Sequence, residues 1–306
     1  MHILNYKNLE KDVLGHLIQY GYLEKETVRP LHNTLNSLEV IKAIRLYQEF
    51  FDLPITGEAD EITTTHMQQP RCGCPDVGIS SLGGSGSWPK GCHGSGEFHQ
   101  FNIFFDYNSI PSWWKPVFKT AFSLVQQAYS NKGISFVEVT DKAKASTIVT
   151  WERGAGWLGL AIVANNPSCG TRIWAKFDNR YGASFNEAQL INQLAMLMGH
   201  EFGHNMGLSH TRGGVMNATL SNFKFTPTVW NGDPHEATLN KWFGGKPVNR
   251  PIPDPDPIPD PPTDPVPPTN PSQEITNGVV YKADGVYQLV PSDKTITIKA
   301  ELKKLI

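Results

Sequence analysis

Apolar residues recur at helical spacing in two stretches near the N-terminus, and a third, shorter helix can follow them. The first stripe ends near Gly21, and the second begins after Ser37, which can cap it. Asp60 can then cap a helix that runs to about Gln68. The apolar positions are Leu9, Val13, Leu17 and Tyr20 in the first stripe and Val40, Ile44, Tyr47 and Phe51 in the second. The pattern predicts a small three-helix bundle within residues 1–78, which we expect to lean on a neighbour because a bundle of this size is marginally stable alone.

Between residues 97 and 245, strand-like and helix-like segments follow one another. Apolar runs predict strands at residues 101–105, 134–139, 146–151, 159–164 and 171–177. A helix capped by Ser112 and ended by Gly133 follows the first strand. The segment 184–187 has the form of a capping box before a long apolar helix, and Asp233 opens a last helix. This order of elements predicts an α+β domain.

Three segments outside these two regions have a biased or short pattern. Residues 79–96 are rich in glycine and serine, which predicts a flexible, exposed segment where proteolysis is easiest. Residues 246–272 are rich in proline and aspartate, which predicts an extended, fairly stiff spacer. Residues 273–306 form a small β-rich tail, too small to predict a stable domain. Its strand-like runs are residues 279–281, 286–289 and 295–298.

Composition excludes several classes of function. The 306-residue chain has a net charge of −2 and is 39% hydrophobic, as expected of a globular protein. It contains no basic block typical of nucleic-acid binding and no apolar run long enough to span a bilayer. The N-terminus lacks the pattern of a secretory signal. The four cysteines, Cys72, Cys74, Cys92 and Cys169, are too few for a disulfide scaffold and lack zinc-finger spacing, and their disulfide state stays open.

The long apolar helix ends in the pattern HExxHxxGxxH. On a helix, residues four apart share a face, so His200 and His204 can present two imidazoles to one metal ion. Glu201 is placed to hold a metal-bound water and take its proton. Gly207 lets the chain leave the helix, and His210 then returns as a third ligand. Three protein ligands with one open position indicate a catalytic zinc site rather than a structural one.

This eleven-residue pattern is the metzincin signature. A metzincin also needs a methionine turn shortly after the third histidine, and Met216 in Gly-Gly-Val-Met supplies it. The alternative is an amphipathic helix with buried, hydrogen-bonded histidines and a methionine that only fills the core. The full pattern with its turn favours the zinc site.

A second motif precedes the glycine-rich segment. Cys72 lies between Arg71 and Gly73 in a proline-flanked stretch, which predicts an extended, exposed backbone from which the thiol can reach outward. A thiolate is a strong zinc ligand, so Cys72 could take the open position and exclude water. Alternatively, Cys72 and Cys74 are loop cysteines, free or oxidised with other partners. The residues alone leave both alternatives open.

Residues 10–245 together resemble a matrix metalloproteinase (matrixin). The family propeptide carries the cysteine-switch motif PRCGVPD, and this chain has PRCGCPD, with Cys74 as the one departure. The resemblance implies that Cys72 binds the zinc in a latent form and that Arg71 and Asp76 steady the loop through a salt bridge. Cys74 could compete for the metal or form a disulfide.

The resemblance also implies features of the catalytic domain. Its fold would be a twisted, mostly parallel sheet backed by two helices. The strand near Leu160 and Ala161 would pair with an extended substrate, and Met196 would border the pocket for the residue after the cut. Location would be secreted or extracellular, despite the missing signal pattern.

Metals beyond the catalytic zinc receive less support. The family's structural zinc needs an upstream HxD pair, which is missing, and two histidines that are replaced by Ile162 and Lys176. We therefore predict that this site is absent. Asp178 matches a calcium ligand of the family, but Asn179 and Arg180 stand where acidic partners are expected, so Ca²⁺ is unsupported. Three other histidines lack ligand spacing and are predicted to lie at the surface: His93, His99 and His235.

The sequence therefore predicts a latent zinc endopeptidase that acts on protein or peptide substrates, with Glu201 as general base. We expect the activating cut within residues 79–96. One alternative is a cell-wall-directed metallohydrolase, since the three-helix region also resembles peptidoglycan-binding modules. Another is a non-enzymatic adhesion or structural protein with a vestigial zinc site, although simple binding gives no use for Glu201.

Overall fold

A computed structural model describes most of the predicted elements. The described residues are 6–24, 35–77, 99–163, 173–220, 223–244, 280–282 and 286–288. The chain divides into two compact units, Met1–Pro259 and Asp260–Ile306. The predictions for residues 79–96, the spacer, the third tail strand, Cys92, His93 and Cys169 lie outside the described residues.

In the second unit, β6 (Val280–Lys282) pairs with β7 (Val286–Gln288) in an antiparallel sheet. These are two of the three predicted tail strands.

The N-terminal helices form the predicted bundle. Helix α1 spans Tyr6–Gln19, α2 Leu38–Phe50 and α3 Glu61–Met67. Their core contains the predicted stripe residues Val13, Leu17, Tyr20, Val40, Ile44 and Tyr47. The Asp60 side chain accepts a hydrogen bond from the Thr63 backbone N–H at 2.8 Å and caps α3 as predicted. Ser37 precedes α2 but makes no side-chain cap bond.

A five-stranded sheet organises the following region, in the order β2-β1-β3-β5-β4. The strands are β1 (His99–Phe105), β2 (Ile134–Glu138), β3 (Thr147–Glu152), β4 (Gly159–Ala161) and β5 (Ile173–Asp178). The β1–β2, β1–β3 and β3–β5 pairs are parallel, whereas β4 runs antiparallel to β5 at one edge. This mixed sheet confirms the α+β prediction, although β4 is shorter than the predicted strand at 159–164.

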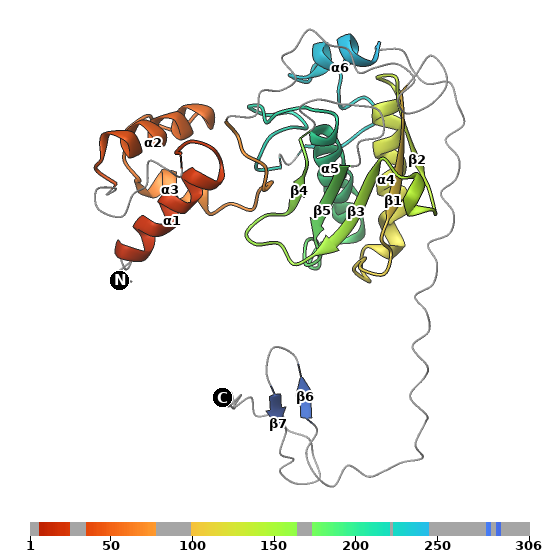
Figure 1. The fold of residues 1–306 in the computed structure, drawn as a ribbon, viewed down its shortest axis with the longest axis horizontal. Coiled ribbons are helices and arrows are strands. Elements are labelled where there is room, and N and C mark those ends of the chain that lie inside the picture. Colours follow the sequence, from red (N-terminus) through yellow and green to blue (C-terminus); the bar gives the residue numbers. More distant parts are fainter. Residues whose placement is uncertain are drawn as a thin grey trace. The chain divides into compact units, whose positions relative to one another are not determined.

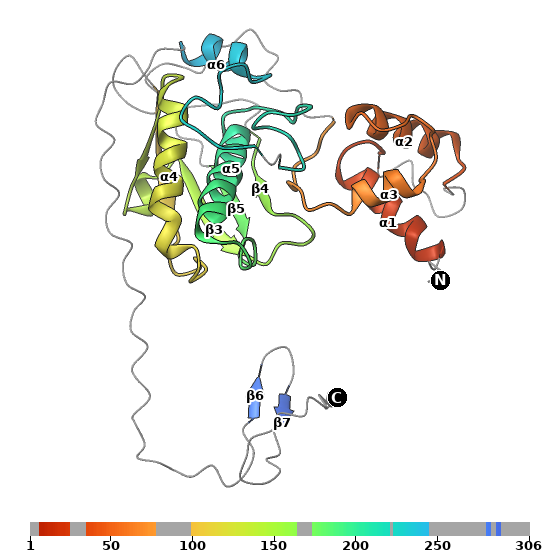
Figure 2. The ribbon, with the colours of Figure 1, turned by 180° about the vertical axis from the view of Figure 1, so that it is seen from behind.

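Two long helices cover one face of the sheet, α4 (Lys115–Ser130) and α5 (Glu187–Asn205) (Figures 1 and 2). A 3₁₀ turn, η2 (Lys142–Lys144), precedes β3, and α6 (Glu236–Phe243) ends at Gly244 in the left-handed conformation. The buried core between sheet and helices is rich in aromatic rings, including Phe101, Phe118, Phe122, Trp151 and Phe177. Among the described residues, no helix combines the length and apolar character that crossing a bilayer requires.

Three predicted helix starts, those of α4, α5 and α6, were wrong by two residues; α6 starts after His235 rather than Asp233. Helix α4 starts after Trp114 rather than Ser112, because residues 112–114 form a turn before it; Trp114 makes no side-chain cap bond. Helix α5 is capped at Asn186 rather than Ser184. A turn through Gly182, whose φ is +79°, still occupies the chain at Ser184.

The prediction that His99 and His235 lie at the surface was also wrong. His99 takes the first inward position of β1 and packs edge-on against Phe243, with ring centroids 5.0 Å apart. His235 is buried just before α6, and its Nε2 lies 2.8 Å from the Ser209 carbonyl oxygen. Both positions depend on packing between distant segments, which ligand spacing cannot reveal.

Candidate metal centre

Helix α5 and the turn after it bring together the residues of the HExxHxxGxxH pattern. His200, Glu201 and His204 are fully buried in the last part of α5. Gly207 has a φ of +89°, which L side chains rarely adopt, and it reverses the chain at the end of the helix. The reversal returns His210 to the helix, where it is also buried.

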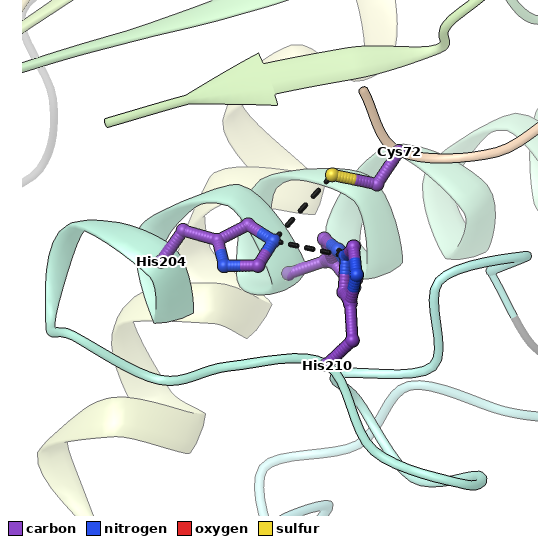
Figure 3. A group of neighbouring side chains, drawn as sticks. Cys72, His204 and His210 are labelled. Atoms are coloured by element: carbon purple, nitrogen blue, oxygen red, sulfur yellow. Dashed lines mark hydrogen bonds between the residues drawn. The ribbon is translucent and has the colours of Figure 1, made fainter. Parts of the chain in front are cut away.

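Three imidazoles and one thiol converge on a common point. The Nε2 atom of His210 lies 3.2 Å from Nε2 of His200 and 3.1 Å from Nε2 of His204. The Cys72 sulfur lies 3.4 Å from Nε2 of His204, and Figure 3 shows it directed at the rings of His204 and His210. The ligand atoms of all four residues lie within 4.8 Å of one another.

The outward nitrogens of the rings explain why the inward ones carry lone pairs. Each Nδ1 faces an oxygen: the Val215 carbonyl at 2.8 Å for His200, the Leu208 carbonyl at 2.8 Å for His204, and the Asp76 carboxylate at 2.7 Å for His210. An oxygen partner requires the proton on Nδ1, so a neutral ring has an unprotonated Nε2. Burial lowers the pKa of His200 and His210 well below the ordinary value. Burial opposes the charged form of His204 too, but the neighbouring Cys74 and Glu201 raise its pKa to about 9. Lone pairs at this separation repel one another unless a cation lies between them.

The spacing fits zinc. Zinc bonds of about 2.05 Å to nitrogen and about 2.3 Å to sulfur set tetrahedral edges of roughly 3.3 Å between nitrogens and roughly 3.6 Å between nitrogen and sulfur. The observed distances of 3.1, 3.2 and 3.4 Å are close to these edges. The donor set, three imidazoles and one thiol, is also one that zinc prefers.

The methionine turn lies against the active-site helix. Met216 is fully buried, and its sulfur packs so closely on Gly203 that a Cβ there would overlap it. The Val215 N–H donates to the Asp233 carboxylate at 2.8 Å, which fixes the carbonyl that holds His200. The sequence suggested Asp233 only as the start of a helix.

Residues 71–76, here called the switch loop, lie between β4 and the segment that follows Met216. The Cys72 N–H donates to the Ala218 carbonyl, and the Gly73 N–H donates to the Gly159 carbonyl, both at 2.8 Å. The Leu158 N–H donates to the Arg71 carbonyl at 2.8 Å. The sequence predicted an exposed backbone here, which was wrong: Cys72 is 0% exposed because these neighbours cover the loop.

Asp76 ties the bundle, the switch loop and the metal centre together. Its carboxylate forms a buried ion pair with Arg71 and accepts a hydrogen bond from the Tyr22 hydroxyl at 2.9 Å. The Arg71 guanidinium stacks on the Tyr20 ring, 3.6 Å from its centroid. The same carboxylate accepts a hydrogen bond from the Nδ1–H of His210. The resemblance implied the salt bridge, but nothing in the sequence indicated the bond to His210.

Glu201 lies beside the metal ligands with no polar partner. It is 0% exposed, and neither carboxylate oxygen has a hydrogen-bond partner among the residues that the structure describes. Burial raises the pKa of Glu201 well above its ordinary value. Strand β4 passes directly over the side chain, since a Cβ on Gly159 would overlap the carboxylate. The structure thus places a buried carboxylate without a hydrogen-bond partner among the described residues next to the cluster of histidines and Cys72.

Comparison with known proteins points to the same family. The chain is 29% identical to rat (Rattus norvegicus) stromelysin-1 over 204 residues, which are 64% of this chain and 41% of that protein. It is 29% identical to matrix metalloproteinase-18 of Xenopus laevis over 57% of this chain and 38% of the relative. It is 30% identical to interstitial collagenase of Oryctolagus cuniculus over 58% of this chain and 37% of the relative. The chain is a distant homologue of the matrix metalloproteinases.

No protein-family model matches this matrix metalloproteinase homologue. Its matched region spans about two fifths of the length of the relatives just described.

Of the residues expected to bind substrate in this matrix metalloproteinase homologue, two lie on β4 and the third lies in the core. Leu160 is half-buried on β4. The Ala161 carbonyl accepts a hydrogen bond from the Cys74 thiol at 3.2 Å. Met196 is fully buried in the core beside α4 and the sheet. The backbone groups that pair with the switch loop belong to Leu158, Gly159 and Ala218. Sequence reasoning missed these three because backbone groups leave no side-chain signal.

The residues at the end of β5 that the resemblance set against further metal sites take part in ion pairs. Lys176 forms a salt bridge with Glu152 at 2.9 Å. Both oxygens of Asp178 accept hydrogen bonds from the Arg180 side chain, at 3.0 and 2.7 Å. The guanidinium thus sits where a cation bound to Asp178 would lie, and Ile162 offers no ligand atom in its side chain.

Proposed function

We propose that this chain is a latent zinc-dependent endopeptidase of the matrix metalloproteinase type. The observation that carries the proposal is the convergence of three Nε2 atoms on a point whose fourth neighbour is the Cys72 sulfur. His200, His204 and His210 would hold the ion in every state, and Cys72 would complete the shell only in the latent one. The likeness to stromelysin-1 and interstitial collagenase supports a proteolytic role.

When bound, zinc would polarise the scissile carbonyl and lower the pKa of a water to about 7. Glu201 would take the proton from that water and deliver it to the departing amine. Its burial and lack of other partners leave both oxygens available for this exchange. Asp76 and the carbonyls of Val215 and Leu208 would keep the three imidazoles oriented.

An extended peptide substrate would replace the switch loop. The Leu158 N–H and the Gly159 and Ala218 carbonyls would pair with the substrate backbone as they now pair with the loop. Leu160 and Ala161 on β4 would contact its side chains or backbone. Met196 would act on the pocket after the cut only from within the core, since it reaches no surface.

The switch loop would also keep the enzyme latent, because it fills both the fourth ligand position and the place where the substrate backbone would bind. Cutting the chain within residues 79–96 would release the bundle. The docking of Cys72 and Asp76 on the histidines favours an inhibitory role for the bundle over cell-wall binding. Substrates would be proteins or peptides, and the likeness to matrix metalloproteinases supports an extracellular location.

The catalytic role of Glu201 can be tested on chain activated by limited proteolysis. Glu201→Gln keeps the size of the side chain but removes the base, so casein cleavage should fall by at least about a hundredfold. Zinc content should stay at the wild-type level because the three histidines are intact. Glu187→Gln, an exposed position in the first turn of the same helix, is the matched control and should cleave normally. Unchanged turnover in Glu201→Gln would refute the proposal.

A further inference from the structure

A second thiol lies inside the metal centre. Cys74 is 1% exposed, and its backbone N–H donates to the Cys72 sulfur at 3.3 Å. Its own thiol donates to the Ala161 carbonyl at 3.2 Å on β4. Cys72 and Cys74 are both free thiols. The loop therefore brings two sulfurs to the same histidine cluster.

The position of the Cys74 sulfur is that of a neighbouring metal ligand. The ligand atoms of Cys72, Cys74, Glu201 and His204 lie within 4.8 Å of one another. This group shares Cys72 and His204 with the set of three histidines and Cys72. An ion bound to those two shared residues would lie next to Cys74, whose sulfur moves by rotation about a single χ1 bond.

The loop does not depend on the Cys72 side chain to stay in place. It is held through the backbone bonds of Arg71, Cys72 and Gly73 to Leu158, Ala218 and Gly159, and through the bond between Asp76 and His210. If the Cys72 sulfur were lost, these bonds would keep Cys74 at the centre. The bond from Cys74 to Ala161 is a weak S–H···O interaction, so breaking it costs little compared with what a zinc–thiolate bond returns.

We propose that Cys74 is a second switch thiol, able to bind the zinc in place of Cys72. This inference rests on the proposed zinc centre. In the exchange, the bond between zinc and the Cys72 sulfur would break, a bond to the Cys74 sulfur would form, and the Cys74 proton would pass to the released Cys72 thiolate, which lies beside it. Modification of one thiol would then leave the enzyme latent, and activation would require the whole loop to leave.

Cobalt substitution tests this directly, because a thiolate bound to Co²⁺ gives a ligand-to-metal charge-transfer band in the near ultraviolet. The full chain would be loaded with Co²⁺ in a non-thiol reductant as wild type, Cys72→Ser, Cys74→Ser and the double variant. We expect the band in the wild type and in both single variants. The double variant should lose it while keeping the visible d–d bands of a metal on three histidines.

Proteolytic activity gives a second readout. Uncut Cys72→Ser should stay as inactive as the wild type. The uncut double variant should be at least tenfold more active, because its loop has lost both zinc–thiolate bonds and more often leaves the place where the substrate backbone would bind. Cys72→Ala repeats both measurements without a hydroxyl that could itself bind the metal.

The outcomes separate the two proposals. A Cys72→Ser chain with d–d bands but no charge-transfer band would overturn the role of Cys74 and leave the zinc centre intact. Persistence of the band in the double variant would also overturn it, because another cysteine would then be the ligand. Absence of d–d bands from all forms would refute the proposed zinc centre, and the role of Cys74 with it.

Discussion

Gly203 is the residue that brings the methionine turn into contact with the active-site helix. It lies between His200 and His204 of α5, and a Cβ there would overlap the Met216 sulfur and crowd the Tyr129 hydroxyl at 3.3 Å. Tyr129 is itself fixed, since its hydroxyl donates to the Gly199 carbonyl at 2.6 Å. Neither neighbour can move freely because both are fully buried. The glycine is therefore required by close packing rather than by an unusual backbone angle.

Replacing this glycine should destabilise the fold. Gly203→Ala should lower the free energy of unfolding by about 1–3 kcal/mol, the usual effect of overpacking a filled core. Urea denaturation followed by tryptophan fluorescence measures it. Gly15→Ala in α1 is the control: its Cβ would meet no atom within 4 Å. That substitution should be neutral or stabilise by about 0.5–1 kcal/mol, because Gly is a weaker helix former than Ala. Equal effects of the two substitutions would contradict the packing argument.

At the scale of single elements, the start of helix α5 was predicted with the correct type of cap but at the wrong residue. The sequence predicted a capping box beginning at Ser184, but the structure forms one at Asn186. The Asn186 side chain accepts from the Gln189 N–H at 2.9 Å, and the Gln189 side chain accepts from the Asn186 N–H at 3.1 Å. Both patterns were present in the sequence. The turn at Gly182 decides between them, because it must be completed before the helix can start.

The two candidate caps can be compared directly. Asn186→Ala removes a side chain that satisfies the first turn of the active-site helix, so unfolding free energy should fall by about 1 kcal/mol. Ser184→Ala, at an exposed turn position, should change it by less than about 0.5 kcal/mol. Chemical denaturation of the two variants side by side gives the answer. A larger loss for Ser184→Ala would restore the original prediction.

The same contrast between local and distant information explains what the sequence could predict of the site. Eleven consecutive residues contain His200, Glu201, His204 and His210. Helix geometry and one turn were therefore enough to predict that their side chains converge. The oxygens that orient the rings could not be predicted, because Val215 and Leu208 contribute only carbonyls. For the fold, periodicity located the helices and strands. It could not give the sheet order or the burial of His99, which depend on contacts between distant segments.

On the scale of the whole molecule, Asp76 joins three parts of the chain in one buried cluster. Its carboxylate accepts hydrogen bonds from the Tyr22 hydroxyl of the bundle and from the Nδ1–H of His210, and it forms an ion pair with Arg71 of the switch loop. Arg71 is only 2% exposed, so its charge depends on this carboxylate. Removing one partner of a buried ion pair leaves an uncompensated charge and costs about 3–5 kcal/mol. Because the pair lies where the bundle meets the catalytic domain, the lost stability should appear as undocking.

Asp76→Asn is therefore expected to open the latent form while keeping the zinc ligands intact. The amide retains the size of the side chain and an oxygen for His210 but no longer neutralises Arg71. A loss of about 3–5 kcal/mol would raise the undocked population by at least about a hundredfold. The uncut chain should then be digested faster by an added protease and show basal cleavage of casein. Asp60→Asn is the matched control, since asparagine caps a helix as well as aspartate does and Asp60 only caps α3 and bonds to Thr56. If uncut Asp76→Asn resists the added protease as well as the wild type does and cleaves no casein, then backbone pairing and the thiols hold the bundle without help from this cluster.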